Sequence, residues 1–154
     1  MTERTEIRFS FYNTTSDFIS FGNVLPYNIE NFNIGGGVFN NTEGNYNYTF
    51  SVDGTFIIGY SYSKTGVNNS GHTRLMLTRT TDGITTTEAI TATQKNSGTT
   101  TGGGLSINNF IIYQFKEGDI IYIYTPYGIP RMNNLTLPSG DNIHNSWWGI
   151  RLDY

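Results

Sequence analysis

Residues 47–63, NYTFSVDGTFIIGYSYS, constrain the fold most, because their side chains alternate with a period of two. One face of the second half is large and apolar: Phe56, Ile58, Tyr60 and Tyr62. Successive side chains of a β-strand point to opposite faces, so this period predicts a strand and excludes a helix. Asp53-Gly54 interrupts the run, and Asp-Gly supplies the positive φ angles of a tight hairpin turn. The segment therefore predicts an antiparallel β-hairpin over 46–63.

Similar short segments recur along the chain, separated by Gly, Asp, Asn and Pro, and none shows a helical period. We expect further strands at 7–12, 18–25, after the glycine-rich bend in 34–39, and at 73–80, 84–93, 105–115, 120–125 and 146–154. Asp82-Gly83 predicts a second, Thr-rich hairpin with a solvated face. The strand at 120–125 is apolar on both faces, which predicts burial on both sides. The sequence thus indicates an all-β fold, an antiparallel two-sheet jelly-roll sandwich, as a single domain over residues 1–154.

The composition narrows the classes of partner. Charged residues make up 14% of the chain and the net charge of −3 comes from scattered positions, so no basic patch exists for nucleic acid. The absence of cysteine means that the core or an oligomer must stabilise the fold without disulfides. No apolar run has transmembrane length and no signal peptide is visible, so we expect no membrane insertion.

The residues give little sign of catalysis. His72 and His144 are the only histidines, and each is expected in an exposed loop without a second ligand at metal-binding spacing. No Gly-x-Ser-x-Gly motif is present, and the glycine runs in 34–37 and 102–104 do not open a helix as a phosphate loop does. Asp119 is expected to be structural in its Gly-Asp turn, with calcium ligation as the less favoured alternative. We expect no enzyme activity, no metal and no cofactor.

Three patterns follow one another along the chain. They are Phe50, Gly54, Phe56 and Ile58; then Tyr113-x-Phe115-x-x-Gly118-Asp119-x-Ile121-Tyr122; then Trp147-Trp148-Gly149-Ile150-Arg151-Leu152. With this order and spacing the chain resembles the globular head of the complement q-subcomponent, within the complement/tumour-necrosis-factor jelly-roll superfamily, over roughly residues 7–154. The resemblance implies a jelly roll that trimerises about a three-fold axis. It also implies a recognition or adhesion role at the surface of a cell, spore or virion, or secretion as part of a larger assembly.

The same strands predict where subunits would meet. The segments 55–63, 105–115, 120–125 and 146–154 carry apolar residues on both faces, whereas a sandwich core covers only one face of each sheet. A homotrimer would cover the second face. The expected interface residues are Ile57, Gly59, Phe110, Ile112, Trp148 and Ile150, opposite the expected core residues Phe56, Tyr60, Tyr113 and Phe115. Gly59 and Ser61 are expected to let subunits approach closely.

Two Asn-rich loops, 64–72 and 126–145, are candidates for binding a protein or glycan ligand. The candidate ligand-binding residues are Asn68, Asn69, His72, Tyr127, Arg131 and Asn133. Loops that are simply solvated explain the same composition. Two functions therefore stay open: a non-enzymatic trimeric head that recognises a protein or glycan, and a structural coat protein of a spore or virion in which trimer assembly is itself the function.

Overall fold

The computed structural model describes residues 6–13, 24–65, 70–96, 104–126, 135–136, 142–143 and 145–153. Within these residues the regular elements are all strands. They are β1 (Arg8–Asn13), β2 (Ile29–Ile34), β3 (Val38–Asn40), β4 (Asn47–Thr49), β5 (Gly54–Thr65), β6 (Ser70–Thr81), β7 (Ile84–Asn96), β8 (Gly104–Phe115), β9 (Ile120–Tyr124), β10 (Leu135–Thr136), β11 (Asn142–Ile143) and β12 (Asn145–Arg151). No helix in this part of the chain is long and apolar enough to cross a membrane.

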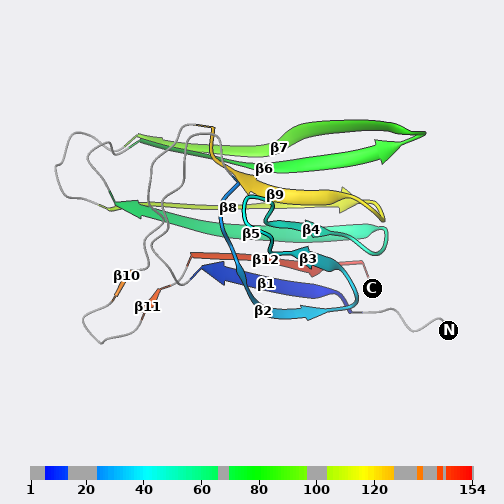
Figure 1. Cartoon of the computed structure of the whole chain (residues 1–154), viewed down its shortest axis with the longest axis horizontal. Coiled ribbons are helices and arrows are strands. Elements are labelled where there is room, and N and C mark those ends of the chain that lie inside the picture. Colours follow the sequence, from blue (N-terminus) through cyan, green and yellow to red (C-terminus); the bar gives the residue numbers. More distant parts are fainter. Residues whose placement is uncertain are drawn as a thin grey trace.

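Two five-stranded antiparallel sheets make up the sandwich, and their strands run along the length of the molecule (Figure 1). Sheet A has the order β2-β1-β12-β5-β8, and sheet B has the order β3-β4-β9-β6-β7. The last long strand, β12, lies between β1 and β5, so the two ends of the sequence meet in the middle of sheet A. β10 and β11 form a separate two-stranded ribbon. The predicted antiparallel jelly roll is confirmed.

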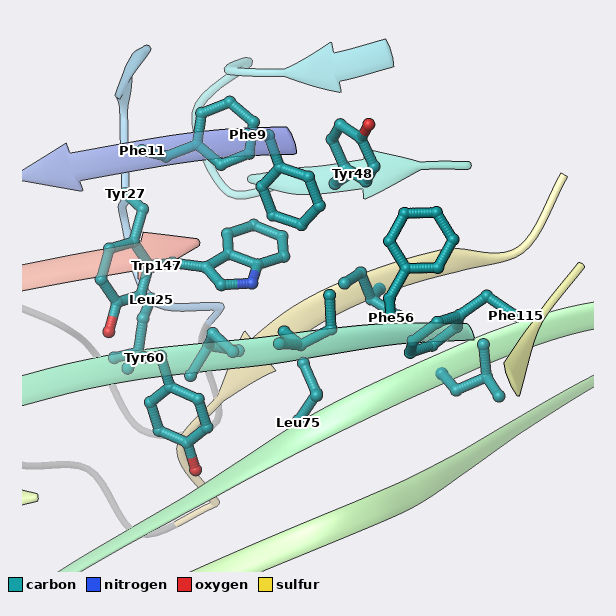
Figure 2. Packing of buried hydrophobic residues seen from close by; sticks show 14 of the residues in the cluster. Phe9, Phe11, Leu25, Tyr27, Tyr48, Phe56, Tyr60, Leu75, Phe115 and Trp147 are labelled. Carbon is teal, nitrogen blue, oxygen red and sulfur yellow. The ribbon is translucent and has the colours of Figure 1, made fainter. Parts of the chain in front are cut away.

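An aromatic core joins the two sheets, as the period of two requires. Trp147 of β12 is fully buried, with its ring centroid 5.4 Å from that of Phe11 and 6.1 Å from that of Tyr27 (Figure 2). At the other end Phe50 stacks on Phe115 at 4.3 Å. The face of β5 expected in the core is buried along its length: Phe56, Ile58, Tyr60 and Tyr62.

The hairpin predicted over 46–63 is wrong. β4 belongs to sheet B and β5 to sheet A, so Asp53-Gly54 lies in a corner between the sheets. The corner is fixed by the turn before β9: the Phe50 amide donates to the Asp119 carbonyl at 2.9 Å, and the Asp53 carboxylate accepts from the Glu117 amide at 2.8 Å. These bonds pair Phe50 and Asp53 with the turn before β9, so both groups are satisfied without a hairpin between β4 and β5.

The second Asp-Gly hairpin is confirmed. Asp82 and Gly83 have φ angles of 51° and 77°, and they connect β6 to β7, which pair antiparallel with one register shift between Leu75 and Met76. Positive φ at both central residues is the geometry that Asp-Gly favours. Residues 81–89 are exposed, in agreement with the expected solvated face.

The strand at 120–125 was expected to be buried on both sides, and this is wrong for its outer side. Ile121 and Ile123 are fully buried, whereas Ile120, Tyr122 and Tyr124 are only half-buried on the outside of sheet B. This outer side therefore does not belong to the same surface as the outer sides of β5, β8 and β12. Of the strand expected at 18–25, residues 18–23 lie outside the described residues, and Val24 forms a single bridge with Tyr124.

Candidate assembly face and ligand-binding surfaces

The outer side of sheet A carries a row of isoleucines. The cross-strand register places Ile150 of β12 opposite Ile57 of β5, and Ile57 opposite Ile112 of β8. The row continues through Arg8 of β1 to Ile34 of β2. Ile112 is 57% exposed and Ile150 is 41% exposed, which is unusual for large apolar side chains that lie side by side on one sheet.

A second row lies beside the first, with Trp148 opposite Gly59 and Gly59 opposite Phe110. Phe110 is 66% exposed and Trp148 is half-buried. A Cβ atom at Gly59 would overlap the indole ring of Trp148, so Trp148 of the same chain already occupies the space above this glycine. Gly59 thus serves a contact within the chain, whereas the sequence suggested a contact between subunits.

The two rows bring together all six residues that the sequence assigned to a trimer interface, and we call this surface the assembly face: Ile57, Gly59, Phe110, Ile112, Trp148 and Ile150. None of the outward-facing side chains of residues 55–61, 108–114 and 146–150 is charged. Charge occurs at the rim, where Arg8 lies 5.6 Å from the Phe32 ring centroid and 3.3 Å from the Glu6 carboxylate. An apolar centre with a charged rim is the usual anatomy of a protein interface.

The assembly face is hollowed where Ile57, Phe110 and Trp148 meet serine and asparagine side chains. A depression of about 540 Å³ lies there, lined by Ile57, Tyr60, Ser61, Asn108, Asn109, Phe110, Ser146 and Trp148. Ser61 accepts a hydrogen bond from the Ser146 amide at 2.9 Å, and the two hydroxyls lie 3.2 Å apart. Ser61, which was expected to permit close subunit approach, therefore joins β5 to β12.

Asp119 is a structural residue, as the sequence indicated. Its buried carboxylate accepts three hydrogen bonds from the Arg79 guanidinium, two of them from Nε at 2.9 and 3.2 Å, and a fourth from the Lys116 amide at 2.8 Å. The hydrogen bond to Asp119 raises the pKa of Arg79 above its usual value. In the described part of the chain, no three His, Asp or Glu side chains gather in a way that could hold a metal ion.

Of the candidate ligand-binding residues, His72 is the one that lies within the described part of the chain. Asn68, Asn69, Tyr127, Arg131 and Asn133 lie outside the described residues and stay predictions, as does the loop position of His144. His72 lies in β6 opposite Gln94, so its expected place in an exposed loop is wrong. It is half-buried, and burial, with a smaller contribution from the Arg74 charge, lowers its pKa.

The sequence did not predict a second hollow, which lies on the outer side of sheet B. It measures about 350 Å³ and we call it the tyrosine hollow; its lining residues are Val24, Asn45, Tyr46, Asn47, Thr78, Ile120, Tyr122 and Tyr124. The sequence contained a signal for it, since Tyr122 and Tyr124 stand two residues apart and share one side of a strand. Because 120–125 was expected to be buried on both sides, these two tyrosines were not predicted to form a surface site.

The chain has a C1q/TNF-like jelly-roll fold. Solved structures with the same fold include an Eiger TNF from S. frugiperda, at a TM-score of 0.72 and 13% identity over 97% of this chain and 94% of that one. Murine APRIL at pH 5.0 matches with a TM-score of 0.67 and 10% identity, covering 96% of this chain and 99% of the other. The globular domain of zebrafish complement 1qA matches with a TM-score of 0.66 and 13% identity, covering 96% of this chain and 98% of the other.

Sequence comparison adds nothing to this classification. No known sequence family and no curated protein matches the chain. At identities of 10–13% the structural likeness establishes the fold and leaves the ligand undefined.

Proposed function

We propose that this chain is a non-enzymatic, homotrimeric head domain, formed by residues 1–154, that recognises a protein or glycan ligand at the surface of a cell, spore or virion, or within a secreted assembly. The observation that carries the proposal is the assembly face. Phe110, Ile112 and Ile150 are each more than 40% exposed on the same side of sheet A, and Ile57 lies between Ile112 and Ile150. A large, uncharged apolar surface on a folded domain marks an interaction site.

Contact with a second copy of the same chain is more favourable for this apolar face than contact with water. Burial of one Phe or Ile side chain contributes about 1.5–3 kcal/mol, and each subunit of a closed ring would bury several such side chains. Closed cyclic symmetry gives every copy the same contacts and leaves no apolar face uncovered. The choice of three subunits rests on the resemblance to complement and tumour-necrosis-factor heads, whose fold this chain shares.

The test is the oligomeric state of Ile112→Asp by sedimentation equilibrium at micromolar concentration. An unpaired charge in a buried interface is very unfavourable, so this variant is expected to be monomeric while the unaltered chain is trimeric. Ile84→Asp is the matched control, because Ile84 is 69% exposed but lies at the β6–β7 turn of sheet B. A monomeric unaltered chain, or a trimeric Ile112→Asp variant, contradicts the proposal.

Recognition is tested with the purified trimer on glycan and protein arrays. A head domain is expected to bind a defined ligand class, and the monomeric Ile112→Asp variant to bind array spots more weakly because it has lost multiple contacts. An intact trimer that binds nothing on either array contradicts a recognition role and leaves assembly as the function.

A further inference from the structure

The tyrosine hollow lies on the opposite side of the sandwich from the assembly face. Tyr122 and Tyr124 project from the outer side of β9, two residues apart, so their Cα atoms are about 7 Å from each other along the strand. Tyr46, which precedes β4, supplies a third ring, and Ile120 continues the apolar surface along β9. The hollow therefore presents aromatic and aliphatic surface from two neighbouring strands.

The polar groups of the hollow are all neutral. Asn47 donates from Nδ2 to the Asn45 carbonyl at 2.7 Å, which orients its amide, and the Thr78 hydroxyl lies 2.9 Å from that of Thr87. Burial raises the pKa of Tyr122, despite a hydrogen bond with Thr78 that lowers it, so the phenol stays uncharged at neutral pH. Amides and hydroxyls of this kind both donate and accept hydrogen bonds.

Charged side chains stay outside the lining. Arg74 pairs with Tyr124 across β6 and β9 but is not among the residues that line the hollow. A site for a phosphate, sulfate or carboxylate group would be expected to place a cation against the ligand. The volume of about 350 Å³ is close to the lower end of small-molecule sites, which span roughly 300–1,000 Å³. The hollow thus fits a small, uncharged ligand with both an apolar face and several hydroxyls.

We propose that the tyrosine hollow binds a neutral hexopyranose residue of a glycan, with the C–H face of the sugar against Tyr122 and Tyr124 and its hydroxyls bonded to Asn45, Asn47 and Thr78. This inference rests on the proposed recognition function but not on the trimer. A pyranose combines the two surfaces that the hollow requires: apolar C–H groups on one side and neutral hydroxyls around the ring. A proline-rich peptide also docks on aromatic grooves. Its backbone carbonyls only accept hydrogen bonds, so they cannot pair with the side-chain amide oxygens of the hollow.

The test is a titration of the isotope-labelled protein with glucose, galactose, mannose and N-acetylglucosamine at millimolar concentration, followed by amide chemical shifts. At least one sugar is expected to cause saturable shifts at residues 45–47, Thr78 and 120–124. Tyr122→Ala and Asn47→Ala are each expected to weaken that binding about tenfold or more, equivalent to 1.4 kcal/mol. Tyr12→Ala, a half-buried tyrosine on the outer side of sheet A, is the matched control and is expected to leave it unchanged.

Tyr122→Phe guards against a folding defect, because it keeps the half-buried ring and removes only the hydroxyl. It keeps the ring against which the sugar is proposed to lie, so it is expected to bind more tightly than Tyr122→Ala. The proposal is overturned if no neutral sugar binds saturably, if the shifts map elsewhere, or if Tyr122→Ala and Asn47→Ala both bind normally. It is also overturned if sialic acid or a proline-rich peptide occupies the hollow and the neutral sugars do not.

The same titration on Ile112→Asp separates this proposal from the trimer. A monomer with unchanged affinity for a monosaccharide supports a site complete within one chain. If the trimer forms but no sugar binds, only the proposed sugar site is refuted. If the unaltered chain is monomeric but binds sugar, only the proposed trimer is refuted.

Discussion

Gly59 and Trp148 show which residue contacts a sequence can predict and which need the sheet. Adjacent tryptophans in a strand must face opposite sides, and Trp147 is indeed in the core while Trp148 lies outside. The position of the Trp148 ring over Gly59 depends on the pairing of β5 with β12, between residues 89 positions apart. No pattern within either strand sets that register, so the role of Gly59 was not predictable.

Gly59→Ala is expected to destabilise the fold by about 1–3 kcal/mol, because the new methyl group must displace the Trp148 ring. Urea unfolding followed by tryptophan fluorescence measures the change. In a Trp148→Leu background the same substitution should cost clearly less, since the flat ring is gone. Equal costs in both backgrounds would show that the ring does not matter.

Asp119→Asn is expected to lower the free energy of unfolding by about 2–3 kcal/mol. The change leaves the Arg79 guanidinium, whose side chain is only 28% exposed, without its carboxylate. Glu117→Gln, two residues earlier and exposed, is the control and is expected to change stability by less than about 0.5 kcal/mol. Similar unfolding midpoints for the two variants would argue against a structural role for the Arg79–Asp119 pair.

At the scale of elements, two identical Asp-Gly signals have different outcomes. Asp82-Gly83 has strands on both sides that are long enough to pair, and it forms a hairpin. Asp53-Gly54 follows β4, which has only three residues and pairs with β3 and β9 instead. Most strands and their core faces were predicted from the period of two, but sheet membership depends on such distant pairings. That is also why the outer side of β9 was assigned to the wrong surface.

Gly83→Ala is expected to destabilise the chain by about 1 kcal/mol, because Gly83 has a φ of 77° that a Cβ atom disfavours. Nothing lies within 4 Å of the added methyl group, so the cost is one of backbone conformation and not of overlap. Gly83→Asn should stay closer to the unaltered chain, since Asn tolerates this conformation. Hydrogen exchange at the tip of the β6–β7 hairpin should accelerate in Gly83→Ala and much less in Gly83→Asn.

At the scale of the whole molecule, burial of tyrosines predicts sensitivity to alkali. Desolvation raises the pKa of Tyr27, Tyr48 and Tyr62 above the usual value near 10. A group whose pKa is higher in the folded state stabilises the fold fully below the unfolded pKa, and this contribution is lost as the pH rises above it. Stability should therefore be unaffected by these residues below about pH 10 and fall above it.

Phenolate absorbance and near-ultraviolet circular dichroism, followed together, measure this effect. Some of the 11 tyrosines are expected to ionise reversibly near pH 10, and the buried ones only as the fold is lost. Tyr62→Phe should move the alkaline transition upward, because the Tyr62 hydroxyl is buried without a hydrogen-bond partner among the described residues. Ionisation of all tyrosines in one step by a protein that stays folded would contradict this expectation.

The two faces of the sandwich have a joint consequence. If sheet A of each subunit faces a common axis, the outer sides of the three sheets B point away from it, and so do the three tyrosine hollows. A single hollow that holds one sugar weakly would then act together with two others on a surface where the same sugar repeats. Linked sites of this kind gain about 10²–10⁴ in avidity when the spacing matches, without any new contact. The head would discriminate by the density of a common sugar and bind the same sugar free in solution only weakly.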